Sequence, residues 1–175
     1  KIITSVNSTS AIEKIASNSG SKVFRTKVGS VEVSRKMMQE NALIGFEENG
    51  GFMYGTHNQV RDGSMTMAIL IDLLANSTNS LSQEMDALPP SFTTKGKIEC
   101  SKDDFKKILG ILKAEPYKKD LTDGIKLFLD GSSWVMVRLS GTEPIARIYA
   151  ESSSQSRLDD IFAKYLQKVK TAADR

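Results

Sequence analysis

Two arginines and a short polar loop are the part of this sequence best suited to chemistry. The loop reads RLSGTEP over residues 138–144, and Arg147 follows it. A glycine lets several backbone N–H groups turn toward one point, two hydroxyl groups add donors, and a guanidinium group such as that of Arg138 matches the oxygens of a phosphate. This composition favours an anion site for a phosphate ester. The alternative is a hairpin in which Ser140, Gly141 and Thr142 serve only the geometry of the turn.

A second polar loop follows the apolar run at residues 42–46. It reads EENGG over residues 47–51. Carboxylate oxygens accept hydrogen bonds from sugar hydroxyl groups, amides donate and accept, and glycines permit close approach of the backbone. Glu47 and Asn49 are therefore candidates for recognising a hydroxyl-rich ligand. The alternative is a plain hairpin turn that binds nothing.

Alternating apolar runs on both sides of the first loop predict the strands that hold it. Residues 134–137 precede the loop and residues 145–150 follow it, and both runs are typical of β-strands. The sequence around them predicts a strand, a helix, a polar loop, a strand and a final amphipathic helix, at residues 92–99, 101–113, 115–124, 125–129 and from 156 onward. Hairpin connections in this order predict an antiparallel sheet backed by helices, an α+β domain.

The first half of the chain has a different pattern. Two apolar strands, at residues 1–6 and 23–26, enclose a helix and form a β-α-β unit, which favours a parallel pair with a right-handed crossover. Asp62 is the expected N-cap of a longer helix with apolar residues at helical spacing. We expect the methionines of this helix, Met65 and Met67, to fill a core.

The composition excludes several classes of protein. Of the 175 residues, 39% are hydrophobic and 26% are charged, which describes a folded globular protein. The net charge of +3 is too small to indicate nucleic acid but is compatible with a small anionic substrate. No apolar run reaches the length of a membrane span, and the single cysteine, Cys100, fits a reducing compartment. We therefore expect a cytoplasmic protein without nucleic-acid or membrane partners.

Taken together, these residues resemble a known family. The pattern RxSGTEPxxRxYxE over residues 138–151 is similar to the phosphate-binding loop of the α-D-phosphohexomutases, and GFEENGG over residues 45–51 is similar to their sugar-recognition loop. This superfamily includes phosphoglucomutases, phosphomannomutases and phosphoglucosamine mutases. Shorter matches at residues 26–29, 61–63, 123–126 and 130–134 extend the resemblance over essentially the whole chain, in the order of the family.

The resemblance implies a fold and a domain organisation. The family has four domains, and this chain is similar to most of the third and all of the fourth. Residues 1–78 would form an α/β layer domain, truncated at its N-terminus, with the sugar-recognition loop. Residues 79–91 would be a linker, and residues 92–175 a TATA-binding-protein-like α+β domain with the phosphate-binding loop. The expected fold class is thus α/β plus α+β, in the C-terminal portion of a larger enzyme.

Two catalytic motifs of the family do not occur in this sequence. One is the Ser-His-Asn-Pro-type loop that carries the phosphoserine, and the other is the Asp-Gly-Asp-type loop that binds Mg²⁺. The resemblance therefore implies that this fragment has no catalytic residue and no metal ligand. The Mg²⁺ ligands would lie outside this chain, in the missing N-terminal domains 1 and 2, and the fragment alone would be inactive.

The family mechanism implies a role for each candidate residue. A phosphoserine donates to a hexose monophosphate, a bisphosphate forms and reorients, and the serine is rephosphorylated, which interconverts hexose 1-phosphate and hexose 6-phosphate. Arg147 would reinforce the charge of the phosphate site, or equally serve a structural ion pair. The phosphate that does not react would be held by Arg138, Ser140, Gly141 and Thr142, and the sugar hydroxyl groups by Glu47 and Asn49.

Two hypotheses for function follow from the sequence. The first is the isomerase activity of a phosphohexomutase, with this chain as its substrate-binding C-terminal portion. The second is a non-catalytic anion-binding, phosphosugar-binding or interaction module that kept the loop. The sequence does not rank mannose, glucose, glucosamine and N-acetylglucosamine phosphates, because Phe46, Asn49 and Gly51 depart from the commonest residues of the family.

Overall fold

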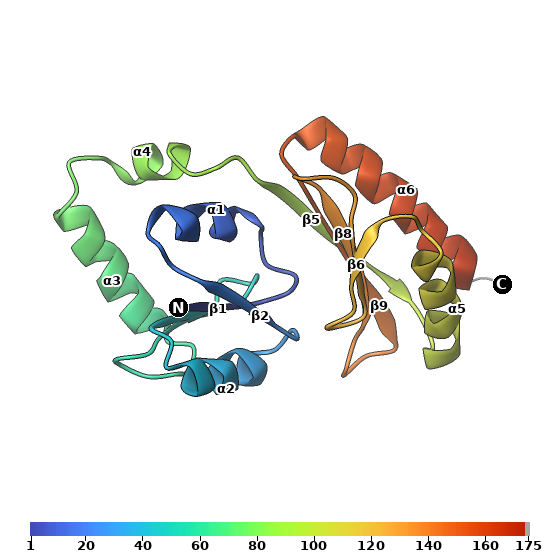
Figure 1. Ribbon diagram of the computed structural model, residues 1–175, viewed down its shortest axis with the longest axis horizontal. Coiled ribbons are helices and arrows are strands. Elements are labelled where there is room, and N and C mark those ends of the chain that lie inside the picture. The colour runs from blue at the N-terminus through green and yellow to red at the C-terminus, as the bar shows by residue number, and fades with distance from the viewer. Residues whose placement is uncertain (174–175) are drawn as a thin grey trace. The chain divides into compact units, whose positions relative to one another are not determined.

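The computed structural model describes residues 1–173 and divides into two compact units, one from Lys1 to Pro89 and one that begins at Pro90. Each unit is built on a sheet of its own (Figure 1). The segment predicted as a linker, residues 79–91, contains the short helix α4 (Leu81–Asp86). Ser80 and Gln83 form a reciprocal capping box at its start, which accounts for the polar residues there.

A four-stranded mixed sheet forms the first unit. Its order is β2-β1-β3-β4, with the strands at Ile2–Ser5 (β1), Val23–Thr26 (β2), Ile44–Phe46 (β3) and Phe52–Tyr54 (β4). Strand β1 runs parallel to β2, as the β-α-β pattern predicts, and also to β3, whereas β4 is antiparallel to β3. Helices α1 (Ala11–Asn18) and α2 (Ser30–Glu40) lie on opposite sides of the sheet (Figure 1).

The core of this unit lies between α2 and the sheet. Val33 and Met37 of α2 are fully buried against Ile3 of β1 and Met53 of β4. Burial of these four side chains fixes α2, and with it the loop that precedes the helix, on one face of the sheet.

Helix α3 (Gly63–Ala75) begins as the sequence predicts but packs differently. The side chain of Asp62 caps it by accepting the N–H of Met65 at 2.9 Å. None of its residues is buried, and Met67 and Ile71 are 58% and 59% exposed. The expectation that its methionines fill a core is therefore wrong for Met67. This helix carries apolar residues on all sides, so spacing alone does not indicate which side is covered.

A five-stranded antiparallel sheet forms the second unit. Its order is β5-β9-β8-β7-β6, with the strands at Phe92–Glu99 (β5), Lys118–Asp120 (β6), Ile125–Phe128 (β7), Trp134–Leu139 (β8) and Ile145–Ser152 (β9). Helices α5 (Lys102–Lys113) and α6 (Gln155–Ala173) lie side by side over one face of this sheet (Figure 1). The α+β architecture expected for this half of the chain is confirmed.

Strand β6 corrects one expectation. It lies inside the segment 115–124, which the sequence predicts as a polar loop. Its three residues, Lys118, Lys119 and Asp120, have no apolar alternation, and the strand exists because it pairs with the antiparallel β7 at the sheet edge. Backbone pairing of this kind leaves no side-chain pattern for sequence analysis to detect.

The core of the second unit contains a tyrosine with an unpaired hydroxyl group. Tyr165 of α6 is 1% exposed, and its Oη has no hydrogen-bond partner among the described residues. Burial, and to a smaller extent the neighbouring Tyr117, raises the pKa of Tyr165 to about 12. A buried hydroxyl group without a partner destabilises a fold.

Tyr165→Phe is expected to stabilise the second unit. The change keeps the ring and removes the unpaired hydroxyl group, so the free energy of unfolding should rise by about 1 kcal/mol at neutral pH. The raised pKa adds a pH dependence. Because the tyrosine ionises at about pH 10 in the unfolded chain, the wild type loses stability as the pH rises from there to about 12. The phenylalanine variant should lack this contribution to the loss. Urea unfolding between about pH 10 and 12 measures the free energy of unfolding of both proteins. An equal decrease in the two proteins over this range would contradict the prediction.

Candidate functional site

Strands β8 and β9 bring the two predicted phosphate-site arginines together. Arg138 of β8 and Arg147 of β9 are direct partners in the antiparallel register. Residues that face each other across two strands project from the same face of the sheet. The loop with Ser140 and Thr142 connects the ends of these strands. The two arginines therefore rise from one face, beside the Ser-Gly-Thr loop.

Hydrogen bonds within the loop place its hydroxyl groups close together. The backbone N–H of Ser140 donates to the carbonyl oxygen of Ile145 at 2.9 Å, which closes the loop. The N–H of Thr142 donates to Ser140 Oγ at 3.4 Å, and the two hydroxyl oxygens lie 3.5 Å apart. The loop thus presents both hydroxyl groups from neighbouring positions.

Asp123 and Gly124 fix the orientation of Arg138. Arg138 Nε donates to Asp123 Oδ2 at 2.9 Å, with 15% and 18% of the two side chains exposed. Gly124 has φ of +70°, and a Cβ atom there would lie 2.3 Å from the carbonyl oxygen of Val137 and 2.8 Å from Arg138 Cα. The glycine therefore lets the backbone pass close to β8, which places Asp123 beside the arginine. Sequence reasoning matched residues 123–126 to the family but gave Asp123 no role.

Arg147 forms an ion pair within its own loop region. Arg147 Nη2 donates to Glu143 Oε2 at 2.7 Å, and both side chains are more than a third exposed. An exposed pair of this kind contributes at most about 1 kcal/mol. Arg147 Nε is buried and has no hydrogen-bond partner among the described residues. An anion can therefore compete with Glu143 for this guanidinium group at little cost.

The predicted sugar-recognition loop is a tight turn in the first unit. Glu47 N–H donates to the carbonyl oxygen of Gly51 at 2.9 Å, and Gly50 N–H donates back to the carbonyl of Glu47 at 3.1 Å. The Glu47 side chain is 8% exposed, and its Oε2 has no hydrogen-bond partner among the described residues. Asn49 Oδ1 accepts the N–H of Gly51 at 3.1 Å, so this amide shapes the turn.

Arg61 is a neighbour of Glu47 that sequence reasoning missed. Arg61 Nη1 lies 3.6 Å from Glu47 Oε2, within ion-pair range. A Cβ atom on Gly51 would lie 2.2 Å from Arg61 Cδ, so the arginine crosses the loop where the glycine leaves room. Gly51 therefore has a steric role beside its place in the turn. The only sequence signal was the match of residues 61–63 to the family.

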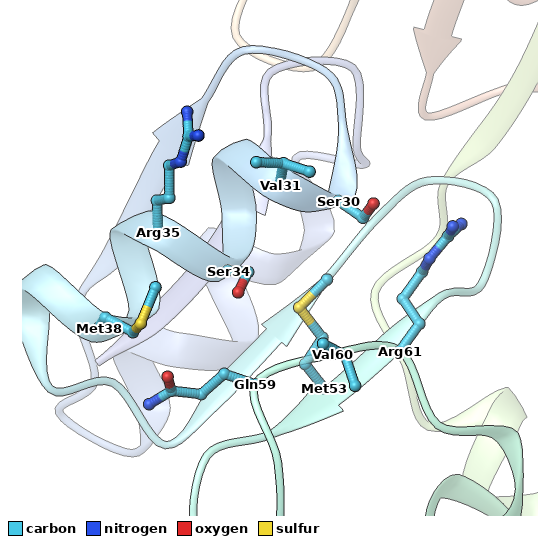
Figure 2. A pocket seen from close by; sticks show the side chains of 9 residues that line it. All are labelled: Ser30, Val31, Ser34, Arg35, Met38, Met53, Gln59, Val60 and Arg61. Atoms are coloured by element: carbon cyan, nitrogen blue, oxygen red, sulfur yellow. The ribbon is translucent and has the colours of Figure 1, made fainter.

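A pocket of about 410 Å³ lies in the first unit between α2 and residues 59–61 (Figure 2). Arg35 and Arg61 stand at its two ends, and Met38 and Met53 contribute apolar wall (Figure 2). Neither Glu47 nor Asn49 lines it. Arg61 therefore both lines this pocket and contacts the Glu47 loop.

The described residues offer no metal centre. Within residues 1–173, no three histidine, cysteine, aspartate or glutamate side chains are grouped closely enough to hold a metal ion. This part of the chain therefore shows no cluster of such side chains as a candidate Mg²⁺ site. In the same part of the chain, no helix has the length and apolar composition needed to cross a membrane.

Comparison with known proteins identifies the family. Residues 1–92 match the sequence model of the phosphoglucomutase/phosphomannomutase alpha/beta/alpha domain III, and residues 95–168 match that of the C-terminal domain of the same enzymes. Together the two matches cover most of the chain. The chain belongs to the phosphoglucomutase/phosphomannomutase family.

Two relatives show how much of such a protein this chain represents. A phosphoglucosamine/phosphogalactosamine mutase of Sulfurisphaera tokodaii is 42% identical over 161 residues, which cover 89% of this chain and 35% of the relative. A phosphoglucomutase/phosphomannomutase of Thermococcus kodakarensis is 38% identical, again over 89% of this chain and 35% of the relative. The chain therefore spans about a third of the length of these proteins.

Solved structures share the fold. A phosphoglucomutase/phosphomannomutase family protein from Burkholderia thailandensis superposes with a TM-score of 0.81 at 22% identity, over 98% of this chain and 38% of that protein. An N-acetylphosphoglucosamine mutase from Aspergillus fumigatus, in complex with GlcNAc-6P and magnesium, gives a TM-score of 0.65 at 15% identity, over 98% of this chain and 38% of that protein. The chain therefore shares its fold with part of each of these proteins.

Proposed function

We propose that this chain supplies the sugar- and phosphate-binding part of a phosphohexomutase, an isomerase that interconverts hexose 1-phosphate and hexose 6-phosphate. The observation that carries the proposal is the direct pairing of Arg138 with Arg147 beside the Ser-Gly-Thr loop. A hairpin turn needs neither arginine. Arg138 uses Nε for Asp123 and Arg147 uses Nη2 for Glu143, so each guanidinium group has further N–H donors for an anion. A phosphate dianion between them accounts for both the residue types and their register.

The phosphate-binding loop would hold the phosphate that does not react. Arg138, fixed by Asp123, presents a guanidinium group in a constant orientation. Ser140 and Thr142 add hydroxyl donors, and Gly141 leaves space for the phosphate at the backbone. Charge-assisted hydrogen bonds of this kind are stronger than neutral ones, so the phosphate anchors the substrate. Such an anchor leaves the sugar free to present either of its ends to the reacting phosphoryl group.

Glu47 and Asn49 would bind the sugar hydroxyl groups. Glu47 Oε2 is a buried acceptor with Arg61 in ion-pair range but with no hydrogen bond among the described residues, and a buried acceptor without a hydrogen bond calls for a physical explanation. A hydroxyl group of the sugar would supply the missing donor. Asn49 uses its carbonyl oxygen within the turn, so its amide hydrogens would donate to the ligand.

The chemistry would reside in other parts of the complete protein. In this proposal residues 1–78 recognise the sugar, residues 79–91 link the domains, and residues 92–175 bind the phosphate. A phosphoserine on the missing N-terminal domains would exchange its phosphoryl group with the bound hexose phosphate. Mg²⁺, held there, would stabilise the negative charge of the transferred group. The same proposal includes a cytoplasmic location. The names of the two relatives refer to different sugars, so the proposal covers hexose phosphates without specifying the sugar.

Calorimetric titration with glucose 1-phosphate and with glucose tests the proposal on this chain. We expect binding of the phosphate ester, much weaker binding of the neutral sugar, and no turnover of hexose phosphate. Equal binding of both ligands, or binding of neither by folded protein, would overturn the phosphate site. Turnover by this chain alone would overturn the assignment of catalysis to other domains.

A further inference from the structure

The row of arginines on the second sheet continues onto a third strand. Lys97 of β5 is the direct register partner of Arg147, which is in turn the partner of Arg138. Three cationic residues therefore stand in one line across β5, β9 and β8, on the same face of the sheet. Lys97 belongs to neither of the loops that the sequence singled out.

A pocket adjoins this row. It has a volume of about 300 Å³ and is lined by Lys95, Gly96, Lys97, Arg147 and Tyr149. Lys95 and Tyr149 are register partners, so they share the face of the cationic row. The pocket thus combines three cationic side chains with a phenol, which is a suitable lining for an anionic group.

Lys97 differs from the two arginines in its charge balance. Arg138 is paired with Asp123 and Arg147 with Glu143. Within the described residues, no ion pair joins Lys97 to a carboxylate, including that of Glu99 two positions along the same strand. The positive charge of Lys97 is therefore the one in this row that no carboxylate neutralises.

The row carries three positive charges against the two carboxylates of Asp123 and Glu143, so part of the repulsion between its members remains. Like charges directly opposite each other destabilise a sheet, and here Lys97 and Arg138 flank Arg147 from both sides. An anion near the row would relieve this repulsion. A cost to stability that a ligand would remove is a typical property of binding sites.

We propose that Lys97 is a further phosphate-binding residue, and that the anion site extends from the Ser-Gly-Thr loop across Arg147 to β5. The inference rests on the proposed function, because it takes the loop to hold the phosphate of a hexose phosphate. Asp123 and Glu143 are paired with the two arginines, so Lys97 supplies the positive charge that attracts a dianion. The ligand class is a phosphate monoester.

Titration with inorganic phosphate and with glucose 1-phosphate at low ionic strength tests this role. Lys97→Gln is expected to weaken binding of both ligands by about tenfold, whereas Lys97→Arg should stay within about twofold of the wild type. Lys170→Gln removes an exposed lysine from the last turn of α6, which is outside the cationic row, and should leave both affinities unchanged. In phosphate-free buffer Lys97→Gln should melt at the same temperature as the wild type or higher.

Thr142→Val separates failure of this inference from failure of the proposed function. One outcome would overturn the role of Lys97 and leave the loop as the phosphate site. In that outcome the wild-type protein binds phosphate, Thr142→Val weakens the binding, and Lys97→Gln has the same affinity as Lys170→Gln. If folded wild-type protein binds neither ligand, the proposed function falls as well. A lower melting temperature of Lys97→Gln in phosphate-free buffer would overturn the repulsion argument.

Discussion

Arg138→Ala is expected to weaken binding of glucose 1-phosphate by about 100-fold, or about 3 kcal/mol. Two effects act in the same direction. The change removes the guanidinium group beside the Ser-Gly-Thr loop, and with it the ion pair that Arg138 forms at 2.9 Å with the mostly buried Asp123. The remaining carboxylate repels a phosphate dianion. Calorimetric titration at low ionic strength measures the loss.

Arg157→Ala is the matched control for this prediction. It breaks another arginine–aspartate ion pair of the same unit. Arg157 and Asp130 lie 3.1 Å apart, and both side chains are exposed. Its affinity for glucose 1-phosphate should stay within about twofold of the wild type, because exposed pairs contribute little. Combining Arg138→Ala with Asp123→Asn should recover part of the affinity, since the carboxylate charge that repels the phosphate is then gone. Equal affinities of Arg138→Ala and Arg157→Ala would show that Arg138 binds no phosphate.

Gly124→Ala is expected to destabilise the second unit by about 3 kcal/mol. The positive φ is unfavourable for any residue with a Cβ atom, and here that atom would overlap backbone atoms of β8 at 2.3 and 2.8 Å. Backbone of a central strand cannot move aside as a flexible side chain can. The displacement would also shift Asp123 from Arg138, so phosphate affinity should fall together with stability. Urea unfolding gives the first quantity and titration the second.

Gly110→Ala is expected to raise the stability of the same unit. Gly110 lies inside α5, and a Cβ atom there would meet nothing within 4 Å. Alanine favours the helix over glycine, so this variant should gain up to about 1 kcal/mol. A Gly124→Ala protein as stable as Gly110→Ala would mean that β8 tolerates the overlap, and would remove the argument that Gly124 positions Asp123.

Local patterns predicted most of the elements around the site. The alternation at residues 134–137 and 145–150 indicated the strands β8 and β9, and Asp62 indicated the start of α3, because these signals arise between neighbours in sequence. Strand β6 was missed because it has no apolar alternation and forms by pairing with β7 at the sheet edge. The exposure of Met67 was also missed, since burial depends on what packs against a helix.

The sequence by itself determined the residue types of both loops, their order along the chain and hence the family. The tertiary structure decided which residues stand together: Arg138 with Asp123, Arg147 with Lys97, and Glu47 with Arg61. These pairs join residues far apart in the chain, and the partners of Arg147 depend on strand register. Side chains alternate between the faces of a sheet, so a slip of one residue would send Arg147 to the opposite face from Arg138. Only the folded sheet fixes that register.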